Sequence, residues 1–347
     1  MTELKRYGYT GAETPAGGLL PARVIAVHRE RYELISENGP LFGRLKTGVY
    51  YGADGEIFPT VGDFVLFRPV AGGDCQIAGT LPRKSYFARR DPDPAGGKQQ
   101  AVAANFDTVF IMTSLNRDFN VNRIQRYLVL ARQSGAVPAV ILTKSDLAAD
   151  FSAMVSATEK IAGGAGVIPV SAVSGSGLGG LDGYLAPGMT AVFLGMSGVG
   201  KSSLLNVLMG RGVMNVSAVR EDDDRGRHTT THRQLFMLPS GAMVIDTPGM
   251  RTLGMWDADG GLSEAFADVE ELLGSCRFSD CRHETEPGCA IRESVIAGTL
   301  SAARWRSYQS LRREAEYTEK RADYLRKKQE RNKNIAKYHR KKNGGIK

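Results

Sequence analysis

One stretch of sequence decides the fold of this chain: Thr190-Ala191-Val192-Phe193-Leu194-Gly195-Met196-Ser197-Gly198-Val199-Gly200-Lys201-Ser202. It begins as an apolar strand, and from Gly195 onward it fits the pattern GxxxxGK[ST] at every fixed position. In that pattern the glycines let backbone N–H groups turn toward phosphates, the lysine reaches the outer phosphates, and the serine hydroxyl is placed for Mg²⁺. We therefore predict a phosphate-binding loop made of Gly195, Met196, Ser197, Gly198, Val199, Gly200, Lys201, Ser202 and Ser203, in which Lys201 is also catalytic.

Short apolar runs alternate with helical segments on both sides of this loop. Helices are predicted over Val121–Ser134 and Lys201–Met209. Such alternation indicates an α/β domain in which helices cover a largely parallel sheet. The predicted strands are Thr108–Thr113, Ala139–Thr143, Val167–Ser171, Thr190–Gly195 and Ala242–Asp246.

Two further motifs follow predicted strands and suggest the base. In Thr143-Lys144-Ser145-Asp146 the carboxylate can accept two hydrogen bonds from the guanine edge, while Lys144 covers the ring. Adenine lacks that pair of donors, so the motif favours GTP over ATP. The pair Ser171-Ala172 could donate backbone N–H groups to the guanine O6. The predicted guanine-binding residues are Thr143, Lys144, Ser145, Asp146, Ser171 and Ala172.

The magnesium ligands are expected from three places in the chain. Asp246-Thr247-Pro248-Gly249 closes an apolar strand, where an aspartate holds Mg²⁺ and the Gly249 N–H can meet the γ-phosphate. One threonine of the run 229–231 is expected to bind Mg²⁺, and Thr230 is the candidate. The predicted magnesium residues are Ser202, Thr230 and Asp246.

The usual water-orienting glutamine is absent after this motif, where the chain has Met250. His228 is the local candidate for the catalytic role, because an imidazole can hydrogen-bond a water and titrates near neutral pH. The alternative is that His228 only contacts a binding partner.

The base-reading motifs precede the phosphate loop, which reverses the usual order in GTPases. A circular permutation explains this order, because it leaves the sheet intact and moves the chain ends. The segment after Gly249 then leads directly into the C-terminal region.

The flanking regions differ in composition from this core. Residues 21–90 alternate β-like runs with turns, which indicates a small β-barrel, and residues 91–97 are rich in Pro and Gly like a linker. We predict three domains: 1–95, 96–258 and a mostly helical 259–347. At the end of the barrel, Arg83, Lys84, Arg89 and Arg90 surround Tyr86 and Phe87. This mixture of phosphate-neutralising charge and stacking faces favours RNA contact, and a solvated loop with two anchoring aromatic residues is the alternative.

Three of the four cysteines fall close together, in the spacing Cys276-x4-Cys281-x-His283-x5-Cys289. Three thiolates and one imidazole suit a tetrahedral metal site with no open position, and such ligands favour zinc over magnesium or calcium. Clustered free thiols beside a histidine are the alternative.

The net charge of +8 is concentrated at the C-terminus. Residues 311–347 hold 14 Lys and Arg against 5 Asp and Glu, whereas residues 1–310 hold 31 and 32. The tail therefore favours a phosphate-rich partner, and we expect it to bind rRNA. No apolar run approaches the roughly 20 residues that span a bilayer. We expect a monomeric cytoplasmic protein without a membrane partner.

Together the permuted motifs, the run Gly226-Arg227-His228-Thr229-Thr230-Thr231 and the cysteine cluster resemble the RsgA family of circularly permuted bacterial GTPases. The resemblance implies an N-terminal OB-fold, a permuted GTPase domain and a zinc-binding domain, and it also points to His228. It further implies binding to the small ribosomal subunit late in assembly, with GTP hydrolysis stimulated by the subunit. Thr143 departs from the family, which more often has Asn there, and we expect weaker nucleotide retention.

The expected function is thus a GTPase that controls subunit maturation and its own release. The alternative is an rRNA-binding assembly factor in which GTP is a switching ligand and hydrolysis is incidental.

Overall fold

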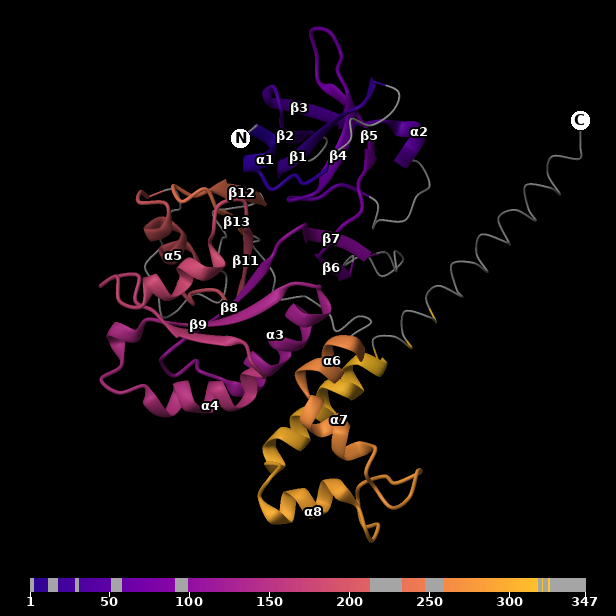
Figure 1. Ribbon diagram of the computed structural model, residues 1–347, viewed down its shortest axis with the longest axis vertical. Helices are drawn as coiled ribbons and strands as arrows, with labels where there is room; N and C mark the ends of the chain where they lie inside the picture. The colour runs from indigo at the N-terminus through magenta and orange to yellow at the C-terminus, as the bar shows by residue number, and fades with distance from the viewer. Residues whose placement is uncertain are drawn as a thin grey trace, which may run out of the picture.

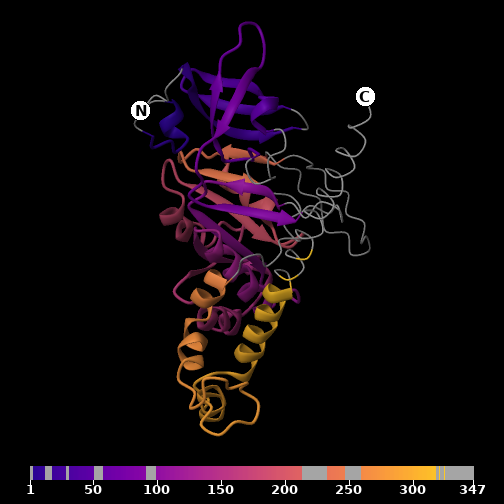
Figure 2. The same cartoon turned by 90° about the vertical axis from the view of Figure 1, so that its right-hand side faces the viewer.

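The computed structural model consists of three parts arranged in a row (Figures 1 and 2): a barrel, a sheet covered by helices, and a helical region. It describes residues 3–11, 18–28, 31–50, 58–90, 99–212, 233–246 and 259–317, together with 320 and 324. Within these ranges, no helix has the length and apolar character needed to cross a membrane.

The middle part is a six-stranded portion of the main sheet, in the order β10-β9-β8-β11-β13-β12. All its strands run parallel except β12 (Gln234–Met237), which is antiparallel to β13. The five predicted strands are confirmed, with ends that differ by at most two residues. The parallel strands are β8 (Thr108–Ser114), β9 (Val137–Thr143), β10 (Gly166–Pro169), β11 (Thr190–Gly195) and β13 (Met243–Asp246).

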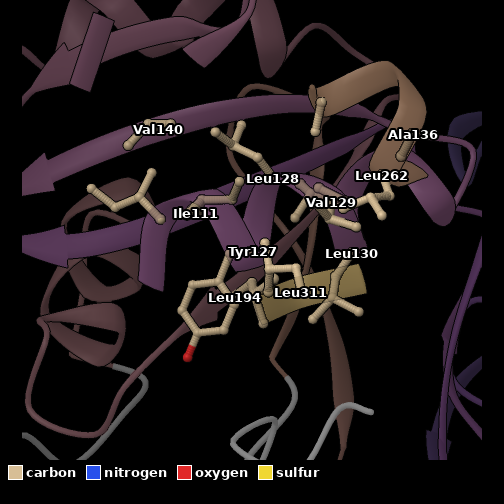
Figure 3. Close-up of a cluster of buried hydrophobic side chains, with 14 of the residues drawn as sticks. Ile111, Tyr127, Leu128, Val129, Leu130, Ala136, Val140, Leu194, Leu262 and Leu311 are labelled. Carbon is tan, nitrogen blue, oxygen red and sulfur yellow. The ribbon is translucent and has the colours of Figure 1, made fainter. Parts of the chain in front are cut away.

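Both faces of this sheet are covered, which explains why its strands are continuously apolar in sequence. Alternate residues of β11 show the arrangement: Val192 and Leu194 pack into one core, whereas Ala191 and Phe193 pack into the other. The first core includes α3 (Val121–Gln133) and residues of α4 (Ser152–Ala162), and Figure 3 shows part of it. The second includes α5 (Lys201–Leu208) and the 3₁₀ turn η4 (Leu178–Tyr184).

The N-terminal part is a closed five-stranded barrel. Its strands pair in the order β1-β2-β3-β5-β4, and β4 pairs back with β1 to close it. Only β3 and β5 run parallel among these pairs, as in an OB-fold. The elements are α1 (Glu3–Arg6), β1 (Leu20–Val27), β2 (Tyr32–Ser36), β3 (Gly39–Leu45), α2 (Thr47–Tyr50), β4 (Phe64–Arg68) and β5 (Cys75–Thr80).

The barrel and the central sheet are continuous through one strand pair. β1 pairs with β12 at Ala26 and Gln234, so the two parts share an eleven-stranded sheet. Beside this junction, β6 (Tyr86–Arg90) and β7 (Gln99–Ala104) form an antiparallel pair. The predicted linker 91–97 lies outside the described residues, and the three domain boundaries stay a prediction.

A buried arginine lies at the same junction. Arg23 on β1 is 1% exposed, and its guanidinium donates five hydrogen bonds. The acceptors are the carbonyls of Tyr7, Gly62 and Asn105, the hydroxyl of Thr190 and the sulfur of Met243. Burial lowers the pKa of Arg23 to about 10, opposed by the charges of Asp107 and Asp63, so the side chain is a cation at neutral pH.

The C-terminal part packs on α3. Its helices are α6 (Asp259–Ala265), α7 (Ala267–Leu273), α8 (Ala290–Ala297) and a helix over 302–317. Leu262 of α6 and Leu311 of the last helix join the core that contains α3 (Figure 3). Arg126 on α3 also pairs with Glu314 at 2.5 Å. The helical prediction for this region is confirmed, and its position on α3 connects it to the central sheet.

We predict that Arg23→Met destabilises the junction between the barrel and the central sheet. Its buried carbonyl acceptors would lose their donors, at a cost of about 3 kcal/mol or more in the free energy of unfolding. Urea unfolding followed by circular dichroism measures this. Arg68→Met, on an exposed position of β4, is the matched control and is expected to change stability by less than about 0.5 kcal/mol. Equal effects of the two variants would contradict the role given to Arg23.

Candidate nucleotide site and metal centre

The predicted nucleotide-binding motifs meet at one edge of the central sheet. Thr143, Gly195 and Asp246 are the last residues of β9, β11 and β13, which run parallel, and Ser171 lies just beyond the parallel strand β10. Parallel strands end at the same edge, where α/β sheets bind their ligands. The structure therefore brings together motifs that are up to about a hundred residues apart in the chain.

The phosphate loop connects β11 to α5, as its sequence predicts. Gly198 and Gly200 have backbone φ angles of 74° and 100°, values that residues other than glycine rarely adopt. A Cβ on Gly195 would lie 2.6 Å from the carbonyl oxygen of Met112, so this position requires glycine as well. The Lys201 ammonium donates to the carbonyls of Gly195 and Met196 at 2.8 and 2.6 Å, which holds the cation against its own loop.

Thr143, the last residue of β9, contacts this loop. Its buried hydroxyl lies 2.6 Å from the carbonyl oxygen of Val199 and 3.2 Å from that of Thr113. One hydroxyl proton serves one acceptor at a time, and the shorter distance favours Val199. Thr143 therefore links the end of β9 to the phosphate loop. The sequence marked Thr143 as a departure from the more usual Asn, and the carbonyl that its hydroxyl contacts was missed.

Asp146 is oriented by a serine from the neighbouring strand end. The Ser171 hydroxyl donates to the carboxylate at 2.5 Å and accepts from the backbone N–H groups of Val173 and Ser174 at 3.2 and 3.1 Å. Because two amides point at the hydroxyl oxygen, its proton is directed to Asp146. We predicted a backbone role for Ser171 and Ala172, and this side-chain contact was missed. Asp146 is exposed, and Lys144 before it has a left-handed φ of 60°.

The structure describes some of the residues that are predicted to bind magnesium and not others. Asp246 ends β13 and is 8% exposed, and it lies opposite Gln234 of β12. Ser202 and Ser203 lie in the first turn of α5. A hydroxyl and a carboxylate oxygen are suitable Mg²⁺ ligands. His228, Thr230 and Gly249 lie outside the described residues, as do the neighbouring threonines and Met250, so their roles stay predictions.

We predict that Thr143→Val weakens guanine nucleotide binding about tenfold, because the buried Val199 carbonyl would lose its donor and the loop would shift. Isothermal titration with GDP measures the loss. Thr143→Ser keeps the hydroxyl and is expected to stay close to the original affinity.

Thr158→Val is the matched control for this experiment. It removes another buried threonine hydroxyl, which donates to the Met154 carbonyl at 2.7 Å within α4. Unchanged GDP affinity in Thr143→Val, or an equal loss in Thr158→Val, would contradict the positioning role of Thr143.

The four predicted metal ligands converge in the C-terminal part. The candidate ligand atoms of Cys276, Cys281, His283 and Cys289 all lie within 4.8 Å of one another. The Nδ1 atom of His283 is 3.5 Å from the sulfurs of both Cys276 and Cys289. Tetrahedral zinc with its usual bond lengths places a sulfur and a nitrogen about 3.5 Å apart. The donor set and the two distances from His283 thus fit a structural zinc ion.

A carboxylate that the sequence did not suggest stabilises the loop between these ligands. Glu286 accepts backbone hydrogen bonds from Arg282, Glu284 and Thr285 at 3.0, 2.9 and 3.0 Å. Hydrogen bonds from its own backbone N–H and from these neighbours lower the pKa of Glu286 to about 2, so it is ionised at neutral pH. The loop includes His283, whose φ is 62°. The only sequence signal is an acidic residue midway between two ligands.

We predict that Glu286→Gln weakens zinc retention on the order of tenfold, because a neutral amide is a poorer acceptor for three backbone donors. Competition with a zinc-binding dye measures the affinity. Glu284→Gln is the control, since its exposed side chain makes no hydrogen bond or ion pair within the described part of the chain. Equal zinc affinities for both variants would show that Glu286 does not support the loop.

Only some side chains of the basic and aromatic cluster predicted at residues 83–90 are exposed on the surface. Phe87 is 4% exposed and stacks on Phe106, so the prediction of a stacking platform is wrong for this ring. Arg83 pairs with the buried Asp63 at 2.7 Å, and Lys84 pairs with Asp107 at 2.5 Å. These pairs occupy two of the four charges that were expected to face RNA. Tyr86 is 40% exposed, and the side chains of Arg89 and Arg90 are not described.

Comparison with known proteins gives a consistent result. Residues 80–256 match the model of the family described as RsgA GTPase. The chain is 44% identical to a "Small ribosomal subunit biogenesis GTPase RsgA 1" from Listeria innocua, over 90% of each chain. It is 41% identical to the protein "Small ribosomal subunit biogenesis GTPase RsgA" from Opitutus terrae, over 91% of this chain and 89% of the relative.

Two solved structures share the architecture. The crystal structure of YjeQ from Thermotoga maritima aligns with a TM-score of 0.63 and 26% identity, covering 84% of this chain and 97% of that one. The structure of YloQ, described as a circularly permuted GTPase, aligns with a TM-score of 0.59 and 23% identity, covering 90% and 99%. The second likeness bears on the fold alone.

Proposed function

The chain belongs to the RsgA GTPase family and is a GTPase, and from that premise we propose that it acts on the small ribosomal subunit. In this proposal it binds the subunit late in assembly, hydrolyses GTP when the subunit stimulates it, and uses hydrolysis to control maturation and its own release. The names of its relatives, which describe GTPases of small-subunit biogenesis, support the choice of partner.

One observation carries the guanine part of the proposal: the pairing of Asp146 with Ser171 beside the phosphate loop. An exposed carboxylate with a fixed orientation can accept from both the N1–H and N2–H groups of guanine. The Thr143 hydroxyl ties this region to Val199 within the loop, so base recognition and phosphate binding share one rigid frame.

The remaining residues take roles around the phosphates. Lys201 would exchange its loop carbonyls for the outer phosphates, and the backbone N–H groups of residues 196–203 would surround the phosphate chain. Ser202 and Asp246 would hold Mg²⁺ together with Thr230. The ion, when bound, neutralises charge that develops on the phosphate oxygens. His228 is proposed to orient the attacking water. Zinc at Cys276, Cys281, His283 and Cys289 is proposed to be structural.

The second candidate function is an assembly factor that binds rRNA and uses GTP only as a switching ligand. Met250, which stands where other GTPases have glutamine, favours this alternative because it cannot orient water.

Hydrolysis of GTP with purified small ribosomal subunits, at fixed salt, tests the proposal. We expect a many-fold stimulation by small subunits and none by large subunits. His228→Ala is expected to abolish the stimulation while GTP binding stays intact. Tight GTP-dependent binding to the subunit without stimulation would instead support the alternative function.

We predict that Asp146→Asn lowers GTP affinity about a hundredfold, because the variant loses a charged acceptor for two guanine N–H groups. XTP carries a carbonyl in place of the guanine amino group, so the amide of the variant is expected to bind XTP better than GTP. Asp150→Asn is the control. Asp150 is an exposed carboxylate just before α4, and it accepts hydrogen bonds from the backbone N–H and the hydroxyl of Ser152. An unchanged preference for GTP in Asp146→Asn would remove Asp146 from base recognition.

A further inference from the structure

A cavity of about 450 Å³ lies in the C-terminal part, between the metal-binding loop and the helix over 302–317. Neither the predicted nucleotide site nor the four metal ligands account for it, although two of those ligands border it. Its lining residues are Cys281, Arg282, His283, Trp305, Tyr308, Gln309, Arg312, Arg313 and Glu316.

One wall of the cavity carries a cation whose position depends on the metal site. Arg282 lies between the ligands Cys281 and His283, and its backbone N–H donates to Glu286. Its exposed guanidinium has no acidic partner among the residues that the structure describes. The predicted metal ligands on either side therefore fix the backbone of Arg282 at the edge of the cavity that this residue lines.

The opposite wall carries two more cations on the last helix. Arg313 donates to the Gln309 carbonyl at 3.1 Å, which fixes the direction of its side chain. Arg312 lies 3.4 Å from Glu316, and both partners are about half exposed, so this pair is weak and easily exchanged for another anion. With three guanidinium groups and one carboxylate, the cavity lining attracts anions.

Aromatic rings that contact one another line the remaining part of the cavity. Trp305 and Tyr308 stack with ring centroids 5.7 Å apart and an interplanar angle of 15°. The imidazole of His283 meets Trp305 edge-on at 5.4 Å, and the Tyr308 hydroxyl donates to Glu270 at 2.8 Å. Tyr308 is buried, whereas Trp305 is only partly buried and contributes ring surface to the cavity. Such a platform needs little reordering when a ligand binds.

We propose that this cavity binds one unstacked nucleotide of a single-stranded RNA segment. The phosphate groups would lie on Arg282, Arg312 and Arg313, and the base would contact the ring of Trp305. Guanidinium groups recognise phosphate, and aromatic faces take up unstacked bases in RNA recognition. An RNA strand is a better candidate than a free nucleotide because the sequence that begins with Arg312 and Arg313 is basic as far as residue 347, with a net charge of +9 over 311–347. The inference rests on the proposed function and adds a site to it.

The experiment uses the full-length, zinc-loaded chain and a fluorescein-labelled single-stranded RNA decamer. Two matched pairs of variants are compared: Arg282→Gln with Arg277→Gln in the same loop, and Arg313→Gln with Arg306→Gln on the same helix. Each pair removes the same charge from an exposed position, inside or outside the cavity lining. Zinc content and GDP affinity are measured for every variant and are expected to stay unchanged.

We expect Arg282→Gln and Arg313→Gln each to weaken decamer binding on the order of tenfold, and the controls to weaken it less than about twofold. The salt dependence gives a readout that a purely structural role would not change. The slope of log K against log salt is negative, and each lost phosphate contact should reduce its magnitude by about 0.7 for a single strand. An RNA duplex is expected to compete poorly with the decamer.

The possible failures are distinguishable. Equal decamer affinity and equal salt slopes within both pairs, in a chain that still binds small ribosomal subunits, would overturn the cavity inference alone. Effective competition by the duplex would overturn the assignment to an unstacked nucleotide. If the original chain binds neither the subunits nor the decamer, the proposed function fails and this inference fails with it.

Discussion

The guanidinium of Arg23 lies where the barrel, the loop before β8 and the central sheet meet, and it is almost completely removed from solvent. A buried cation is stable only if its N–H groups find acceptors, and here carbonyls, a hydroxyl and a sulfur from several chain segments supply them. Thr190 and Met243, two of the contacted residues, begin the strands whose other ends carry the phosphate loop and Asp246. The orientation of the barrel and the starting points of β11 and β13 are therefore set by the same side chain.

The two neighbours of the central sheet are attached by different kinds of contact. The barrel side depends on buried polar groups, with Arg23 and the pair of Arg83 and Asp63 among them. The C-terminal side depends on apolar packing against α3, with ion pairs such as Arg126 to Glu314 at its margin. Polar contacts impose strict geometry, whereas apolar contacts are less directional. The barrel side thus has the more directional of the two sets of contacts.

Sequence reasoning located the parts of the molecule that follow from local pattern. The strands around the phosphate loop, the loop itself and the cysteine cluster were predictable because each has a periodicity or a fixed spacing. Contacts between distant segments were not predictable, since nothing in the sequence pairs Thr143 with the Val199 carbonyl or Ser171 with Asp146. The prediction was wrong for Arg83 and Phe87 for a related reason. The residue type alone does not show whether a basic or an aromatic side chain lies on the surface or in the interior. Arg83 is held by the buried Asp63, which lies twenty positions earlier in the chain.

The pairing of β12 with β1 has a further consequence for how this architecture resists self-association. A strand at the margin of a sheet exposes unpaired backbone groups that can recruit another chain. β12 would be such a margin for the nucleotide-binding sheet, but β1 of the barrel lies along it at Ala26 and Gln234. The barrel then closes on itself through β4, so each of its five described strands is paired on both sides. The barrel therefore covers the β12 edge of the sheet against edge-to-edge pairing with another chain, whereas β10 lies at the opposite edge.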